Sequence, residues 1–266
     1  TNFAAESAFQ QHQMSGILTF EENTDGLLLE SSVRFRDAWF LKDSSWLQWQ
    51  LTYEAKAHDD LITRGGNVLN LDAGTELDLL YFGDTSGAFR YHLHATFYDR
   101  TVAGRGQMLN AHPSYYFSDQ YVMTLGMWYT KADDWLLWQG GNALNGFERD
   151  EFNANLSFNA TLDEKQELRF QLQWVALAAK GKTANRVNLD GDLIASVVEV
   201  EDFSMSDTAV QLRYRYEIAP LSNIYLVYSR GGRAVLDEDK SFSSLFSPGW
   251  EKRDGDNISV KVRYQF

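Results

Sequence analysis

The sequence lacks cysteine altogether, and only 3 of its 266 residues are proline. Without cysteine the chain can form neither a disulfide framework nor a metal site built on thiolates. No segment approaches the ~20 consecutive apolar residues of a transmembrane helix. Basic residues are scarce, with 24 Lys and Arg against 37 Asp and Glu, so the net charge is −13. This acidic balance argues against a nucleic-acid partner.

The chain does contain a recurrent alternation of polar and apolar residues, which predicts about twelve β-strands. In Trp46–Lys56, one face carries Leu, Trp, Leu, Tyr and Ala, while the other carries Gln, Gln, Thr, Glu and Lys. The segments Leu27–Phe35, Phe89–Arg100 and Phe152–Leu162 alternate in the same way, and a first strand is expected within Phe9–Phe20.

The final strand, Asn257–Phe266, alternates without a break and stops on a phenylalanine. A strand with one apolar and one polar face and an aromatic C-terminus is typical of an outer-membrane β-barrel, where the faces meet lipid and a wet lumen. Strands of about ten residues also suit a tilted bilayer crossing, whereas soluble strands average about 5–6. A soluble sandwich, with its polar faces in solvent, is the alternative.

The connections between strands are predicted to alternate in length. Short ones are expected near 42–45, 83–87, 118–120, 163–166 and 220–222. Long ones are expected near 58–74, 131–147, 180–206 and 233–256. Short turns on the periplasmic side and long loops on the outer side are the outer-membrane pattern, and an even strand count places both termini in the periplasm.

These patterns predict one all-β domain over 1–266, a transmembrane antiparallel up-and-down β-barrel, with 1–12 as a periplasmic lead-in. Residues 1–11 have neither the basic nor the apolar region of a signal peptide, so we expect a mature or processed chain. Aromatic residues near strand ends are expected to form interfacial girdles: Trp39, Phe40, Trp46, Tyr115, Tyr116, Phe117 and Tyr129.

A repeat is visible within the first 150 residues. Lys56–Asp60 precedes Gly65–Asn70, and Lys131–Asp134 precedes Gly140–Asn145, with the same spacing from Lys to Gly. Duplication of a hairpin, with glycines supplying turn conformations, explains the repeat most simply. A repeated ligand-binding loop is the sharper hypothesis.

The polar face of the predicted barrel is rich in arginine and glutamine. We expect these residues to line the pore: Arg34, Arg36, Gln48, Gln50, Glu54, Arg90, His92, His94, Asn155, Arg169, Gln171, Gln211, Arg213, Arg215, Lys261 and Arg263. Buried guanidinium and carboxylate groups must be paired or hydrated. The face is therefore either a salt-bridge network that fills a narrow barrel or the lining of a channel for small polar or anionic solutes.

Other constellations are weaker. His92 and His94 share a face, but no third metal ligand accompanies them. The acidic loop Asn188–Asp192 does not complete the ligand spacing of an EF-hand. His94 with Thr96, or His58 with its neighbouring aspartates, would have to carry a barrel hydrolase of the lipase or protease type. We predict no cofactor, no metal and no catalytic residue.

Two passages, Gln166–Leu177 and Pro220–Gly232 with the strand Lys261–Phe266, resemble the C-terminal barrel of an uncharacterised bacterial envelope family. Members of that family carry an N-terminal carbohydrate-binding-like module ahead of an outer-membrane barrel. The resemblance covers Trp135–Phe266 well and the first half loosely. It implies a bacterial outer-membrane location and a carbohydrate-related role through a module that is absent from this sequence.

The expected function is a narrow porin-like channel, or the membrane anchor of a periplasmic sugar-binding module. The expected partners are outer-membrane lipids, including lipopolysaccharide, and small polar or anionic solutes. A barrel hydrolase and a surface receptor are the alternatives, and the sequence does not fix the oligomeric state.

Overall fold

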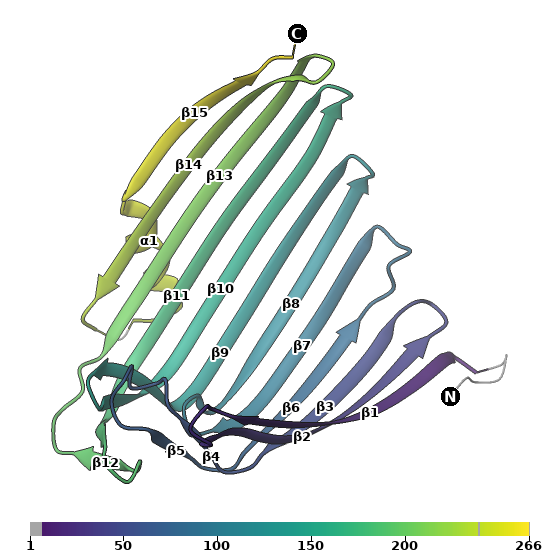
Figure 1. The fold of residues 1–266 in the computed structure, drawn as a ribbon. Coiled ribbons are helices and arrows are strands. Elements are labelled where there is room, and N and C mark those ends of the chain that lie inside the picture. Colours follow the sequence, from purple (N-terminus) through teal and green to yellow (C-terminus); the bar gives the residue numbers. More distant parts are fainter. Residues whose placement is uncertain (1–6, 239, 266) are drawn as a thin grey trace.

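A computed structural model describes residues 7–238 and 240–265 of the chain. Nearly all of this part forms one antiparallel sheet (Figure 1). Its strands are β1 (Phe9–Glu22), β2 (Leu28–Leu41), β3 (Trp46–Glu54), β6 (Gly74–Phe82), β7 (Phe89–Arg100), β8 (Gly104–Ser118), β9 (Tyr121–Gly140), β10 (Ala143–Asp163), β11 (Gln166–Val187), β12 (Leu193–Ser196), β13 (Phe203–Ala219), β14 (Ser222–Leu236) and β15 (Gly255–Arg263). A separate small hairpin pairs β4 (Ala57–Asp59) with β5 (Leu69–Leu71).

The sheet has thirteen strands in simple up-and-down order. The short strand β12 pairs only with β11, and each of the others lies beside its neighbour along the sheet. The predicted all-β antiparallel architecture is therefore confirmed. Among the described residues no pairing joins β1 to β15, so the sheet has two open edges.

Several strands are longer than the alternation predicted. β9, β10 and β11 contain 20, 21 and 22 residues, and β9 and β10 are joined through Gly141 and Asn142 alone. The prediction of a long loop over 131–147 is thus wrong, because both strands continue past the predicted membrane segment as a paired hairpin. Likewise, much of 180–206 is strand, and Phe9–His12 belong to β1 rather than to a lead-in.

The short turns lie where the sequence predicted them, at what we call the short-turn end of the sheet. Asp43 and Asp84 stabilise two of these turns by accepting hydrogen bonds from the backbone and hydroxyl of Ser45 and Ser86 respectively. These bonds lower the pKa of both carboxyl groups. The first strand, β1, begins at this end, and the last strand, β15, ends there (Figure 1).

The strand register divides the sheet into two continuous faces, because paired residues point to the same side. On one side, Leu51 pairs with Leu77, and Leu77 pairs with Phe97. Apolar residues are paired in the same way on later strands, for example Leu156 with Leu125 and Leu172. We call this side the apolar face. The opposite side, where Gln50 pairs with Asp78 and Asp78 with Thr96, is the polar face.

No hydrophobic core underlies the central part of this sheet in the described residues. Apart from alanines, the buried hydrophobic side chains are Leu69, Leu136, Leu144, Phe147, Leu177, Val187 and Leu245. Except for Leu245, these residues lie toward the end of the sheet opposite the short turns, which we call the long-connection end. The one described helix, α1 (Phe242–Glu251), carries Leu245 and links β14 to β15. No helix of the described residues has the length and apolar character needed to cross a bilayer.

Candidate functional site

The polar face carries every residue that we predicted to line a pore. The register links them from strand to strand: Arg90 pairs with Ser114, and Gln171 pairs with Gln211, along one continuous row. Arg213 and Arg215 lie on β13, and Lys261 pairs with Tyr225 on the same face. The sheet thus gathers these side chains on a single surface, although they span most of the chain.

Several charged groups on this face form ion pairs. The Arg215 guanidinium lies 2.9 Å from Glu167, 3.3 Å from Glu217 and 2.8 Å from Asn223 Oδ1. Near the long-connection end, the Arg100 guanidinium lies 2.6 Å from Glu54 and 3.2 Å from Glu76. Such partners are what a cation needs when it is removed from bulk water.

The Nε atoms of Arg34 and Arg100 are buried without a hydrogen-bond partner among the described residues, as are Thr52 Oγ1 and Asn153 Oδ1. Buried polar groups are normally satisfied by protein or by ordered water. These atoms therefore mark positions on the polar face where water would complete the hydrogen bonding.

His94, Asp78 and Thr96 form a compact cluster in the centre of the polar face. Asp78 Oδ1 lies 3.0 Å from His94 Nε2 and accepts a hydrogen bond of 2.8 Å from Thr96 Oγ1. Thr96 Oγ1 also lies 3.1 Å from the same histidine nitrogen. A catalytic triad places its carboxylate and its nucleophile on different ring nitrogens. The cluster therefore has the geometry of a structural hydrogen-bond network.

Six aromatic rings form a row across the polar face. Centroid distances between neighbours run from 4.2 to 6.0 Å along Phe40, Trp46, Phe82, His92, His112 and Trp128. All but the last contact are stacked. Phe40, Trp46 and Tyr116, which we expected in interfacial girdles, share the polar face with their pairing partners, whereas girdle rings lie on the outward-facing, apolar side.

This ring row, and with it His112, is absent from the sequence-based predictions. The signal is a cross-strand one: each ring lies on a different strand, and only the register aligns them. Within one strand, neighbouring residues point to opposite faces, so a run of aromatics such as Tyr115–Phe117 must divide between the two.

Gly126 makes room for the last ring of the row. A Cβ at this position would lie 2.8 Å from both His112 Cε1 and Trp128 Cη2. The Trp128 indole therefore lies over Gly126 on its own strand, edge-on to the His112 ring.

The repeated segments meet at the long-connection end. The segment 55–73, which we call the cap, contains β4 and β5 and the first copy of the repeat. The backbone amide of Asn67 donates a 2.6 Å hydrogen bond to Asn142 Oδ1 in the second copy. Leu69 and Leu144, which occupy matching positions in the two copies, pack together with Leu136 and Val187.

The cap contacts connections from many parts of the sheet. Asp60 accepts a hydrogen bond from Asn23, between β1 and β2, and the Asp72 amide donates to Thr101, between β7 and β8. Asn70 donates to Asp190 and Asp192, between β11 and β12. The acidic loop thus fastens the cap, and His58 hydrogen-bonds the carbonyl oxygen of Leu28.

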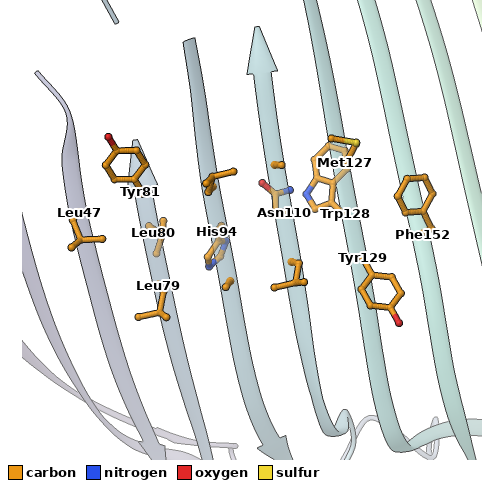
Figure 2. A pocket seen from close by; sticks show the side chains of 14 residues that line it. Leu47, Leu79, Leu80, Tyr81, His94, Asn110, Met127, Trp128, Tyr129 and Phe152 are labelled. Carbon is orange, nitrogen blue, oxygen red and sulfur yellow. The ribbon is translucent and has the colours of Figure 1, made fainter. Parts of the chain in front are cut away.

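The apolar face presents a shallow hollow over β3 to β10 (Figure 2). Its lining is almost wholly apolar and includes Leu47, Leu79, Leu93, Leu109, Met127, Tyr129 and Phe152, with the small residues Ala95 and Ala111. One acidic side chain on this face, Asp37, is buried and accepts a hydrogen bond from Trp39 Nε1 at 3.2 Å. It also contacts His12, so its carboxylate has partners.

The described residues contain no cluster of three or more His, Cys, Asp or Glu side chains that could hold a metal ion. Comparison with curated proteins found no match to this chain. Comparison with protein-family models found one match, and it covers both halves of the chain. The chain belongs to the family described as Domain of unknown function (DUF5916), whose model matches residues 2–266.

Proposed function

We propose that the sheet is the wall of a β-barrel in a bacterial outer membrane. Its apolar face contacts lipid, and its polar face encloses a narrow aqueous lumen that passes small polar or anionic solutes. The short-turn end lies in the periplasm, and the cap lies at the outer mouth.

The observation that carries this proposal is the apolar face itself. Large aliphatic side chains on it are about half exposed or more, for example Leu51 (47%), Leu93 (46%) and Val260 (65%). At about 25 cal/mol per Å² of apolar surface, leaving such a face in water across a whole sheet is strongly unfavourable. Monomeric soluble proteins rarely expose apolar patches beyond a few hundred Å². Lipid is the solvent that suits such a face.

Transport is supported by the charge distribution on the polar face. Arg169, Arg213 and Arg215 lie close together on β11 and β13, where Arg169 and Arg213 are paired across the strands. Arg215 and Arg169 both contact Glu167, and Arg215 also contacts Glu217, so three guanidinium groups face two carboxylates. A local excess of guanidinium groups favours anions in a narrow lumen.

The cap supports a second candidate, a plugged barrel that anchors a periplasmic sugar-binding module. It is held to connections at both sides of the sheet through Asn23 and Asp192. A segment fixed in this way at the mouth of a barrel restricts passage.

Conductance in a planar lipid bilayer tests both candidates. The refolded protein, with folding verified by heat-modifiable migration, is expected to give small ohmic steps with anion preference. Replacing Arg213 and Arg215 by glutamine should abolish that preference, because Glu167 and Glu217 would then be unbalanced.

The matched control is Lys180→Gln with Lys182→Gln, which removes the same charge outside the proposed lumen. If this control abolishes anion preference equally, the assigned lining is wrong. Silence from a folded, inserted protein would exclude the channel and favour the plugged anchor. Failure to insert into bilayers would refute the barrel.

A further inference from the structure

Helix α1 lies on the apolar face, the side that the proposed barrel turns to lipid. Phe242 packs edge-on against Tyr129 with ring centroids 6.1 Å apart, and it lies at the same distance from Phe152. Phe246 packs edge-on against Trp174 at 5.3 Å. In Figure 1 the helix lies behind β13 and β14, on the far side of the sheet.

The part of β13 that the helix contacts carries hydroxyl side chains, unlike most of the apolar face. Three successive outward positions, Ser204, Ser206 and Thr208, carry hydroxyl groups, and all three are buried. Thr208 Oγ1 donates a 2.7 Å hydrogen bond to the Gly249 carbonyl oxygen, and Trp174 Nε1 donates to Ser206 Oγ at 3.1 Å. Hydroxyl groups facing hydrocarbon without partners would be costly. Here the helix bonds Thr208, while Ser204 donates to the Glu238 carbonyl oxygen at 2.6 Å and accepts from the Lys240 amide at 3.0 Å, just before the helix.

Gly249 allows this close approach. A Cβ at that position would overlap Ser206 Oγ and lie 3.2 Å from the Ser206 carbonyl oxygen. Leu245, one turn earlier, is fully buried. The helix is therefore docked through Leu245 and Gly249.

The helix crosses the strands rather than following one of them. Its N-terminal end contacts β9 and β10 through Phe242, its middle contacts β11 through Phe246, and Trp250 at its C-terminal end reaches Arg230 of β14. Barrel strands tilt by about 35–45° from the membrane normal, and an orientation near the membrane plane is compatible with an element that crosses them. Ten residues of helix extend about 15 Å, half of a bilayer's hydrocarbon thickness.

The apolar face changes character at the level of this helix. On β9, Tyr129 is followed on the same face by Lys131, and on β10, Phe152 is preceded by Asp150. Lys131 lies 3.2 Å from Glu148 and 3.6 Å from Asp150, and Tyr129 Oη donates to Asp150 at 2.7 Å. Aromatic rings with polar tips directed toward charged groups are typical of a membrane–water interface.

The side of the helix that faces away from the sheet is polar, as expected for a helix at a membrane–water interface. Ser243, Ser244, Ser247 and Glu251 are exposed, while Phe246 and Trp250 remain partly exposed beside the sheet. The Arg230 guanidinium lies 4.4 Å from the Trp250 ring centroid, a cation–π contact.

We infer that α1 is an interfacial helix that docks on the outer wall of the barrel and lies in the lipid headgroup region of the leaflet on the long-connection side. The inference rests on the proposed membrane barrel, and its partner is the lipid surface. The helix seals hydroxyl groups of β13 that lipid would not tolerate, and it fixes the depth of the wall in the membrane.

The absence of cysteine permits single-site spin labelling without background. Labels are placed by Ser247→Cys on the helix, Val260→Cys on the wall and Lys180→Cys on β11, where Lys180 pairs with Glu148 of the charged group described above. Collision of each label with oxygen and with a water-soluble nickel chelate is measured by electron paramagnetic resonance in phosphatidylglycerol–phosphatidylcholine vesicles. The Ser247 label is expected to give a depth between those of Val260 and Lys180.

Gly249→Val in the Ser247→Cys background is expected to undock the helix and move that label into water, while a label at Val260 keeps its depth. Gly255→Val is the matched control, because a Cβ there meets nothing within 4 Å. A Ser247 label as accessible to nickel as the Lys180 label, with Val260 still in lipid, would overturn the interfacial helix alone. Water exposure at Val260 as well would refute both the barrel and the helix assignment.

Discussion

Asparagine side chains contribute hydrogen bonds between the cap and the connections of the sheet, as Asn142 and Asn70 do. Asn142 Oδ1 accepts the hydrogen bond of the Asn67 amide, and its backbone carbonyl accepts one from Val187 at 2.9 Å. Gly66 lies so close to Asn142 that a Cβ at residue 66 would overlap its Oδ1. The paired copies of the repeat thus serve as the two halves of a contact, which supports the structural interpretation over a ligand-binding loop.

We predict that Asn142→Ala loosens the cap. Leaving a part-buried amide unpaired costs about 1–3 kcal/mol. Hydrogen exchange at Asn67 and Leu69 should accelerate, while exchange in the centre of the sheet stays unchanged. Asn145→Ala, at the last position of the same repeat copy, is the control. Equal acceleration in both variants would contradict the role given to Asn142.

At the level of elements, each strand contributes to two different environments. The ring row on the polar face joins six strands, and its planes are almost parallel between Trp46 and Phe82, which differ by 6°. Ring pairs of this kind contribute about 0.5–1.5 kcal/mol each beyond area burial. The row therefore stabilises the register of six adjacent strands near the short-turn end, namely β2, β3, β6, β7, β8 and β9.

Gly126→Val is expected to disrupt the end of this row. A side chain at residue 126 would lie too close to His112 and Trp128, and such overpacking costs about 1–3 kcal/mol. The denaturation midpoint, followed by tryptophan fluorescence, should fall, and the near-ultraviolet circular dichroism should weaken. Gly16→Val provides the comparison, since nothing lies within 4 Å of a Cβ there. If the two variants lose equal stability, the ring row has no such role.

The whole molecule is a sheet with two long open edges. β1 and β15 each pair on one side only, so a row of backbone groups on each strand lacks a strand partner in the described residues. Unpaired backbone groups are not tolerated in the hydrocarbon of a bilayer, which is why membrane-spanning sheets close. The proposed membrane location therefore requires both edges to be paired.

We predict that the amides of β1 and β15 become protected from hydrogen exchange when the protein inserts into lipid. Disulfide scanning between Ser15→Cys and Cys substitutions at Asn257, Ser259 and Lys261 would identify the partner. A bond within one chain indicates that β1 pairs with β15, and a bond between chains indicates pairing of copies. Fast exchange at both edges in an inserted protein would contradict barrel closure.

The local alternation of residues was sufficient to predict the all-β class, the positions of the short turns and the two-faced character of the sheet, but not the full length of β9, β10 and β11. A period of two residues decides which side chains share a face, so Arg34, Gln171 and Arg213 could be assigned to one surface without coordinates. Each of these inferences depends only on neighbours along the chain.

Only the tertiary structure decided what depends on register between strands. The row from Phe40 to Trp128, the meeting of Asn67 with Asn142 and the docking of Gly249 on Ser206 each join residues far apart in sequence. A one-residue change of register would turn every side chain of a strand to the other face. The sequence by itself therefore determined the faces of each strand, and the pairing of strands decided which residues meet on them.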